Sequence, residues 1–301
     1  MADIGLSEEE GEQHPTCGGL RIGKRLNERG PHQRADERLE WDQDGQYFHY
    51  LTKWMHALCR MGRETGEARY LRWAAELAVA AHRAFTRETY PGGPKRMVWK
   101  MSIDLSRPLV SSMGQHDPLD GLITCLELQT AGGFEVDGGV DLTSAIAETT
   151  EMCAKANWTT DDPLGIGGLL NNASRLAQLI FQRNVERHEL LYQVLVDTGS
   201  SLQEFARSSL LHRPAEHRLA FRELGLSIGL HGLTRVRDLV AGDRELAAVC
   251  NGLLLYAPLA GQIEHFWCDS EHRLSSSWLD HRDINVVMLV TTLVPESYLQ
   301  L

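Results

Sequence analysis

The sequence predicts an all-α fold in which helical hairpins form an (α/α) toroid. The tripeptide Asp-Pro-Leu occurs at 117–119 and at 162–164, each time before a glycine-containing apolar segment, and a third such segment lies at 225–233. Asp at the N-cap followed by Pro at the first helical position is a strong helix start. Glycine inside a helix costs about 1 kcal/mol relative to alanine, so its recurrence indicates close helix packing. Repeated helix starts favour a closed ring of hairpins around a cavity.

The clearest helix begins after Asp44-Gly45 and carries two stripes with helical spacing. The apolar stripe consists of Tyr47, Leu51, Trp54, Met55, Leu58 and Met61. The polar stripe consists of His49, Lys53, His56 and Arg60. Such a helix is expected to have protein core on one side and a wet cavity on the other. We therefore expect His49, Lys53 and His56 to line that cavity.

A second helix is expected at 65–86, and the turn sequence at 90–94 ends it. Apolar and polar side chains then alternate over 95–104. A period of two predicts an extended, strand-like excursion. We expect an extended loop at 95–115 over one mouth of the toroid.

The remaining chain is predicted to be helices joined by short polar loops. These helices are placed near 117–130, 141–156, 162–182, 186–211, 216–239, 243–267 and 281–294. No linker is long enough to separate two domains. We predict a disordered acidic tail at 1–16 and a single toroid domain at 17–301, with about five or six hairpins.

The composition limits the possible partners. Of 301 residues, 43% are hydrophobic and 24% charged, which suffices for a sizeable core. The net charge of −11 argues against nonspecific binding to nucleic acid or to an anionic membrane. No signal-peptide pattern is present, and the longest apolar stretch, 246–263, is interrupted by polar residues, Pro and Gly. We expect a cytoplasmic protein with neither nucleic-acid nor membrane partners, and the oligomeric state stays open.

Neither a metal nor another cofactor is predicted. The six cysteines include no C-x-x-C pair, and five occupy apolar helical contexts, as reduced core thiols do. His49 and His56 lie roughly 10 Å apart along one helix, too far to hold one ion together. A metal site would require His116, His231 or His265 to converge from other helices.

The repeated hairpins, the aromatic and histidine-rich segment 46–56 and the acids at helix mouths resemble a known architecture. It is the (α/α) toroid of six-hairpin glycosidases and of the N-acylglucosamine 2-epimerase type. The resemblance covers about residues 20–295 as architecture, without a residue-by-residue match to either catalytic signature. It implies a carbohydrate-handling enzyme with acid/base chemistry at the cavity mouth.

The leading catalytic candidates are His116, Asp117 and Asp120. Asp117 is positioned to cap its helix, and Asp120 lies three residues later on the same side of the first turn. A histidine beside two carboxylates can perform general acid/base catalysis, and the long preceding loop is a common place for functional residues. The alternative is a helix cap followed by a solvated first turn.

The densest acidic cluster surrounds Trp41. Glycosidic cleavage needs two carboxylates beside the bond, and an aromatic ring can stack on the sugar. We predict Asp42 and Asp44 as catalytic partners across the mouth, and Trp41, Trp54 and Trp99 as stacking surfaces. The alternative is that one acid caps the helix while the others are solvated.

A third cluster joins Glu264 and His265 to Phe266 and Trp267 at a predicted helix end. An acid, an imidazole and an indole together suit a sugar or another polar ring, so Glu264 and His265 are substrate-binding candidates. The alternative is an exposed helix C-terminus with a histidine near the helix dipole.

The sequence therefore predicts an enzyme that hydrolyses or isomerises a sugar-like small molecule through carboxylate and histidine side chains. One alternative is a helical scaffold or ligand-binding protein without a working acid/base pair. Another is a toroid enzyme for an apolar substrate, with a cavity lined by Tyr47, Trp54 and Met55.

Overall fold

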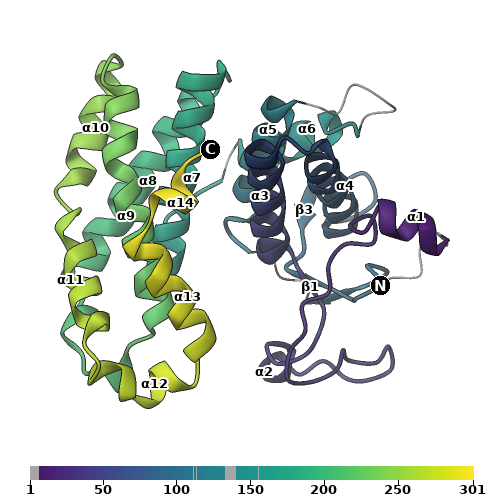
Figure 1. Ribbon diagram of the computed structural model, residues 1–301, viewed down its shortest axis with the longest axis horizontal. Helices are drawn as coiled ribbons and strands as arrows, with labels where there is room; N and C mark the ends of the chain where they lie inside the picture. Colours follow the sequence, from purple (N-terminus) through teal and green to yellow (C-terminus); the bar gives the residue numbers. More distant parts are fainter. Residues whose placement is uncertain (1–6, 111, 113, 133–139, 155) are drawn as a thin grey trace. The chain divides into compact units, whose positions relative to one another are not determined.

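The computed structural model describes residues 7–110, 112, 114–132, 140–154 and 156–301. The protein is mostly helical, with 65% helix and 6% strand, which confirms the all-α class. The chain divides into two compact units, Met1–Ala156 and Asn157–Leu301, and each is described by itself (Figure 1).

The first unit combines helices with two small sheets. Its helices are α1 (Glu8–Gln13), α2 (Glu37–Glu40), α3 (Phe48–Thr65), α4 (Ala68–Phe85), α5 (Asp117–Ala131) and α6 (Thr143–Cys153). Its strands are β1 (Gln46–Tyr47), β2 (Thr86–Glu88), β3 (Lys95–Met97), β4 (Lys100–Met101) and β5 (Pro108–Val110). Apolar side chains of α3, α4 and α5 form one core cluster that includes Phe48, Met55, Phe85 and Leu128.

The extended excursion predicted from residue 95 is present as β3, β4 and β5, while residues 111 and 113 of the predicted loop lie outside the described residues. β4 is the central strand of an antiparallel sheet in the order β1-β4-β5, and β2 pairs with β3. The pairing of Tyr47 with Lys100 places the start of α3 against the excursion. Both faces of β4 are covered, because Lys100 and Met101 are each fully buried.

The described residues of the predicted acidic tail include a short helix. Residues 8–13 form α1, which begins with a capping box between Ser7 and Glu10. The indole of Trp73 on α4 donates to the carbonyl of Gln13 (2.7 Å), and the hydroxyl of Thr16 donates to the carbonyl of Trp73 (2.7 Å). These hydrogen bonds dock the segment on α4. Residues 1–6 of the predicted tail lie outside the described residues.

The described residues of the second unit form helices joined by loops and turns, without a strand. Its α-helices are α7 (Pro163–Arg183), α8 (His188–Arg207), α9 (Ala220–Val240), α10 (Arg244–Leu254), α11 (Pro258–Cys268), α12 (Ser276–Leu279), α13 (Arg282–Leu293) and α14 (Glu296–Leu299). Short 3-10 turns occur at Leu210–His212, Ala215–His217 and His272–Leu274.

The single helix expected at 243–267 is wrong. The structure has two helices there, α10 and α11, separated by a turn at 255–257. Pro258 is the first residue of α11. A proline within a continuous helix would lack one N–H donor and would clash with the carbonyl four residues earlier, so the chain restarts at this position.

One stretch of the described residues has the length and composition of a membrane span. It covers Arg244–Cys268 and so includes both α10 and α11; the mean hydropathy of an 18-residue window within it is 1.5. By composition alone this is weak evidence for a membrane.

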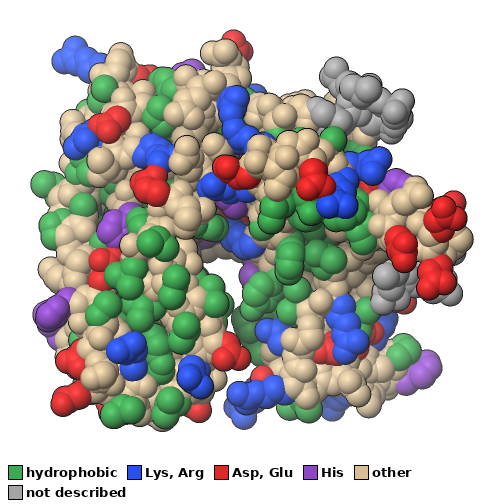
Figure 2. All heavy atoms as spheres, in the orientation of Figure 1, with side chains coloured by type: hydrophobic (Ala, Val, Ile, Leu, Met, Phe, Trp, Pro, Cys, Tyr) green, Lys and Arg blue, Asp and Glu red, His purple; other side chains and the backbone are tan. Residues whose placement is uncertain are grey.

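Hydrophobic side chains also gather on the surface over α12 and α13 (Figure 2). Four of them are more than half exposed: Leu279, Val287, Val290 and Leu293.

Close packing between α7 and α9 confirms the interpretation of the recurrent glycines. A Cβ on Gly167 would lie 2.1 Å from the carbonyl oxygen of Gly225, and one on Gly229 would lie 2.6 Å from the carbonyl oxygen of Gly167. The backbones of the two helices therefore touch at glycines. Gly168, the next residue of α7, has no atom within 4 Å of the corresponding Cβ position.

This pair of neighbouring glycines gives a matched test of the helix contact. Gly167→Ala should destabilise the protein by about 1–3 kcal/mol, because backbone must move to admit the methyl group. Gly168→Ala should stabilise it by up to about 1 kcal/mol, because alanine is the better helix former and space is open. Chemical unfolding measures both, and equal effects of the two substitutions would contradict the backbone contact.

Candidate functional site

A buried ion pair fixes the loop that precedes α3. The ammonium of Lys100 donates to the Glu40 carboxylate (2.9 Å), to the Glu40 carbonyl (2.7 Å) and to the Gln43 carbonyl (3.1 Å). Arg29 donates to the same carboxylate. Burial lowers the pKa of Lys100, and its hydrogen bond to Glu40 opposes that shift. The loop that carries Trp41 is thereby tied to β4.

Four aromatic side chains gather where this loop, β4 and α3 meet. The Trp41 and Trp99 rings have centroids 4.3 Å apart, and His49 stacks on Trp99 at 5.9 Å with an interplanar angle of 16°. The ring centroids of Tyr50 and His49 lie 4.4 Å apart. We call these four residues the aromatic group. It reaches solvent, because Trp41 is 61% exposed.

The polar stripe of α3 faces α5. Lys53 donates to Asp120 (3.1 Å), and Nδ1 of His56 lies 2.8 Å from the Glu127 carboxylate. Asp120 and Glu127 are seven residues apart on α5, which is two helical turns, so both lie on one face. His56 is buried in this pair, whereas the Lys53 side chain is 44% exposed. His56 thus holds α3 to α5 rather than facing solvent.

Asp117 differs from the helix cap expected of it. The N-cap of α5 is His116, no side chain caps this helix, and Asp117 is its first helical residue. Its carboxylate is buried, and Oδ2 has no hydrogen-bond partner in the described part of the chain. Burial, with the negative charge of Asp120 as the second cause, raises the pKa of Asp117 to about 7.

The second Asp-Pro-Leu tripeptide provides an internal comparison. Asp162 is the N-cap of α7, its carboxylate accepts from the backbone N–H of Leu164 (3.1 Å), and Arg222 pairs with it at 2.8 Å. The same tripeptide thus begins two helices, but the carboxylate of Asp162 caps its helix whereas that of Asp117 lies in the protein interior. Burying a carboxyl group costs free energy, so Asp117 is a candidate for function.

His49 and Asp117 share the same charged neighbours. Burial, followed by the positive charge of Lys53, lowers the pKa of His49 to about 4, while Asp120 opposes that shift. Lys53 and Asp120 also act on Asp117. Lys53 and Asp120 thus lie near both residues, and we call the four side chains the acid/base group; among them, His49 stacks on Trp99. Near neutral pH the group contains a neutral imidazole and a carboxyl group that is poised to exchange a proton.

The other candidates around α3 fall into different roles. Asp42 is exposed, and Trp54 is 52% exposed on α3. Asp44 is buried, where it accepts from the backbone of Lys24 (2.5 Å) and from Arg21. Burial would raise its pKa, but these hydrogen bonds outweigh burial and hold the pKa of Asp44 below its usual value. Asp44 therefore braces the chain near residue 24.

The third predicted cluster belongs to the second unit. Glu264 accepts hydrogen bonds from Ser227 (2.7 Å) and Thr292 (2.9 Å), and Nε2 of His231 lies 2.5 Å from the same oxygen. Burial would raise the pKa of Glu264, but the three hydrogen bonds together hold it below its usual value. His265 is exposed. The carboxylate of Glu264 thus joins three helices, α9, α11 and α13.

Two residues of the site were missing from the sequence-based prediction. Tyr50 belongs to the aromatic group, and the ammonium of Lys24 lies 5.2 Å from the ring centroids of Tyr47 and Tyr50. Tyr50 lies three residues before Lys53, so the helical spacing of the polar stripe could have included it. Lys24 lies in an irregular segment, where periodicity provides no signal.

Comparison with known proteins does not assign a function, so the function is argued from the residues of the site. No family model, curated protein or solved structure matches the chain.

The raised pKa of Asp117 predicts a pH-dependent cost in stability. The folded state disfavours the charged carboxylate, so the cost is absent below the ordinary pKa of 3.8 and complete above about 7. Asp117→Asn should remove it and stabilise the protein increasingly from about pH 4 to pH 7, by at most about 4 kcal/mol. Melting temperatures measured across this range test the effect, with the exposed Asp161→Asn as control. An equal pH dependence of Asp117→Asn and the wild type would contradict the buried carboxyl group.

Proposed function

We propose that the protein is an enzyme that acts on a carbohydrate or a similar polyhydroxylated small molecule by acid/base chemistry in the first unit. The observation that carries the proposal is the buried carboxyl group of Asp117, whose Oδ2 has no hydrogen-bond partner in the described chain and whose pKa is raised to about 7. A general acid or base works best when its pKa lies near the operating pH. Structural carboxylates such as Asp44 show the opposite shift.

The substrate class follows from what surrounds Asp117. The aromatic group offers ring faces next to a charged lysine and a carboxylate, which is the combination of apolar surface and few polar contacts found in small-molecule sites. Aromatic rings pack against the C–H faces of a sugar, while Lys53 and His49 can bond its hydroxyl groups. An entirely apolar substrate would leave Lys53 and Asp120 without use.

The reaction that fits best is isomerisation or epimerisation by proton transfer. Such a reaction needs a group that takes a proton from carbon and a neighbouring group that returns one. The neutral imidazole of His49 can take the proton, and the protonated carboxyl group of Asp117 can return one, which supports this reaction. Glycoside hydrolysis requires two carboxyl groups beside the bond, but the second carboxylate here, Asp120, is paired with Lys53. Hydrolysis therefore remains the second reaction to test.

The toroid is part of the same proposal. Support comes from the packing of consecutive helices, as α3 lies against α4, α5 against α6, and α7 against α8. A ring of such hairpins would place the start of α5, with Asp117, at one mouth. A scaffold without catalytic activity would have no need for an acid/base group with these pKa values.

The first experiment is a thermal-shift screen of the purified protein against sugars, amino sugars and sugar phosphates. A ligand present at 100 times its Kd should stabilise the protein by about 2.7 kcal/mol. Each hit is then incubated in D₂O. Isomerisation by proton transfer incorporates deuterium at carbon, whereas hydrolysis releases a new reducing end. The absence of a stabilising sugar, or hits without any turnover, would contradict the proposal.

Variants then separate catalysis from binding. Asp117→Asn should reduce kcat by about 10²–10⁴-fold with the substrate affinity retained, because the amide cannot exchange the proton. Trp99→Ala should weaken binding, which tryptophan fluorescence measures. Tyr90→Ala, at an exposed turn of the same unit, is the control and should change neither quantity. An active Asp117→Asn variant would exclude this residue as the acid or base.

A further inference from the structure

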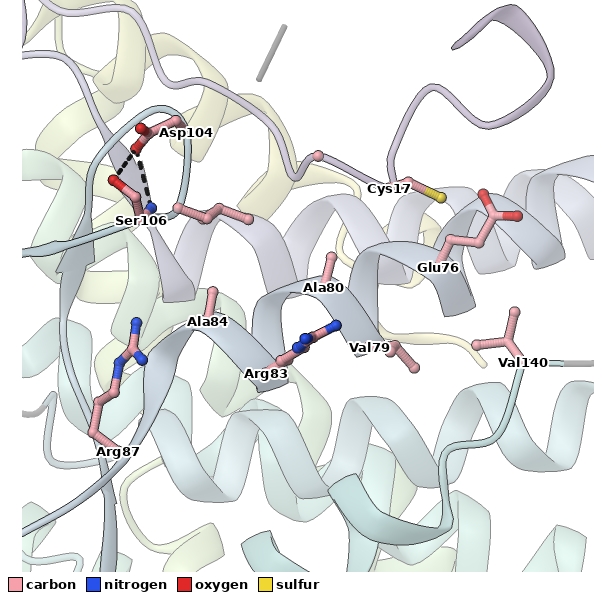
Figure 3. A pocket seen from close by; sticks show the side chains of 12 residues that line it. Cys17, Glu76, Val79, Ala80, Arg83, Ala84, Arg87, Asp104, Ser106 and Val140 are labelled. Carbon is pink, nitrogen blue, oxygen red and sulfur yellow. Dashed lines mark hydrogen bonds between the residues drawn. The ribbon is translucent and has the colours of Figure 1, made fainter. Parts of the chain in front are cut away.

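Three potential metal ligands that are not part of the acid/base group converge in the first unit. They are His14 at the end of α1, Cys17 three residues later, and Glu76 on α4. One donor atom from each lies within 4.8 Å of the other two. Figure 3 shows the thiol of Cys17 directed towards the carboxylate of Glu76.

The carboxylate of Glu76 is only partly used by the protein. Nδ1 of His14 lies 2.6 Å from Oε1, Oε2 is buried with no N–H or O–H donor among the described residues, and the Cys17 thiol, a weak donor, hydrogen-bonds to the carboxylate. The whole residue is only 9% exposed. A buried carboxylate oxygen without an N–H or O–H donor costs free energy, and a cation beside it would remove that cost.

The surrounding chain holds the three residues in place. Thr16 and Trp73 tie the segment after α1 to α4. On the other side of Cys17, the side chain of Gln46 donates to the carbonyl of Gly18 (3.0 Å) and accepts from the backbone N–H of Leu20 (2.8 Å). The ligands are thus brought together by the fold before any ion binds.

We propose that His14, Cys17 and Glu76 form a site for a divalent transition-metal ion, with Zn²⁺ as the best fit. Thiolate and imidazole donors favour zinc over Mg²⁺ and Ca²⁺, which prefer oxygen ligands. A tetrahedral zinc ion with bonds of about 2.0–2.3 Å needs its ligand atoms roughly 3.3–3.8 Å apart. Side-chain movements of about 1 Å close the present arrangement around the ion.

Three protein ligands leave one coordination position for water. Cys17 and Glu76 also line a pocket of about 660 Å³, together with Arg83 and Ser106, through which water can reach the ion (Figure 3). Binding releases the thiol proton, because the thiolate is the ligand. Without metal, burial and then the charge of Glu76 raise the pKa of Cys17 to about 11, so the thiol keeps its proton.

The test uses the full chain without a histidine tag, stripped of metal with a chelator. Zinc should bind at one equivalent per chain in competition with a chromophoric chelator. Cobalt(II) in its place should produce a thiolate-to-metal charge-transfer band and the visible absorption of a tetrahedral complex. Cobalt spectra without the thiolate band would overturn the proposal in the wild-type protein, independently of any variant.

Variants identify the ligands. Cys17→Ser and Glu76→Gln should each weaken zinc binding by about 100-fold or more, since the loss of an outer-shell contact alone costs 10–100-fold. Cys268→Ser, at the exposed end of α11, is the matched control and should bind zinc like the wild type. Thermal unfolding without metal checks that each variant folds. Wild-type affinity in a folded Cys17→Ser variant would overturn the site.

Discussion

The contact of Lys100 with Glu40 is the interaction on which the arrangement of the candidate site depends. The lysine is fully buried, and its three acceptors all belong to residues 40–43. Removing one partner of such a pair leaves an uncompensated charge and costs about 3–5 kcal/mol. Because Trp41 follows Glu40 and Trp99 precedes Lys100, the same contact brings the two indoles together. The ring of Tyr47, 5.1 Å from the ammonium, adds a cation–π contact.

The protonation states of His49 and Asp117 depend on this arrangement. Trp99 packs against His49, and burial keeps that imidazole neutral. One turn later, Lys53 pairs with Asp120 and fixes the first turn of α5. Asp117 then lies in the interior beside a like charge, which stabilises its protonated form. At neutral pH the buried Asp117 therefore reduces the stability of the fold, a cost that the proposed acid/base role would carry.

Local signals in the sequence were sufficient for most helices. The stripe from Tyr47 to Met61 predicted α3, and Asp162-Pro163 predicted the start of α7. The break at Pro258 was missed because the apolar pattern continues across it. The glycines of α7 and α9 indicated close packing correctly, since a side chain at Gly167 would meet backbone.

The roles of the polar residues were harder to predict, because burial depends on residues distant in sequence. Lys100 is one of the polar positions in the alternating pattern of 95–104, yet in the structure it is fully buried and paired with Glu40. Asp117 and Asp162 begin the same tripeptide and have opposite environments. The three proposed metal ligands span residues 14–76, and the N-terminal pair lies in a stretch whose charge suggested disorder.

The most direct test of this account is the titration of the Asp117 carboxyl group itself. Carbon-13 NMR of protein labelled at the aspartate carboxyl carbons follows each group with pH, and the signal missing from Asp117→Asn identifies residue 117. The account predicts a midpoint at about 7. A midpoint near the ordinary value of 3.8 would show a solvated carboxylate and would contradict the role of Asp117 as the acid or base of the site.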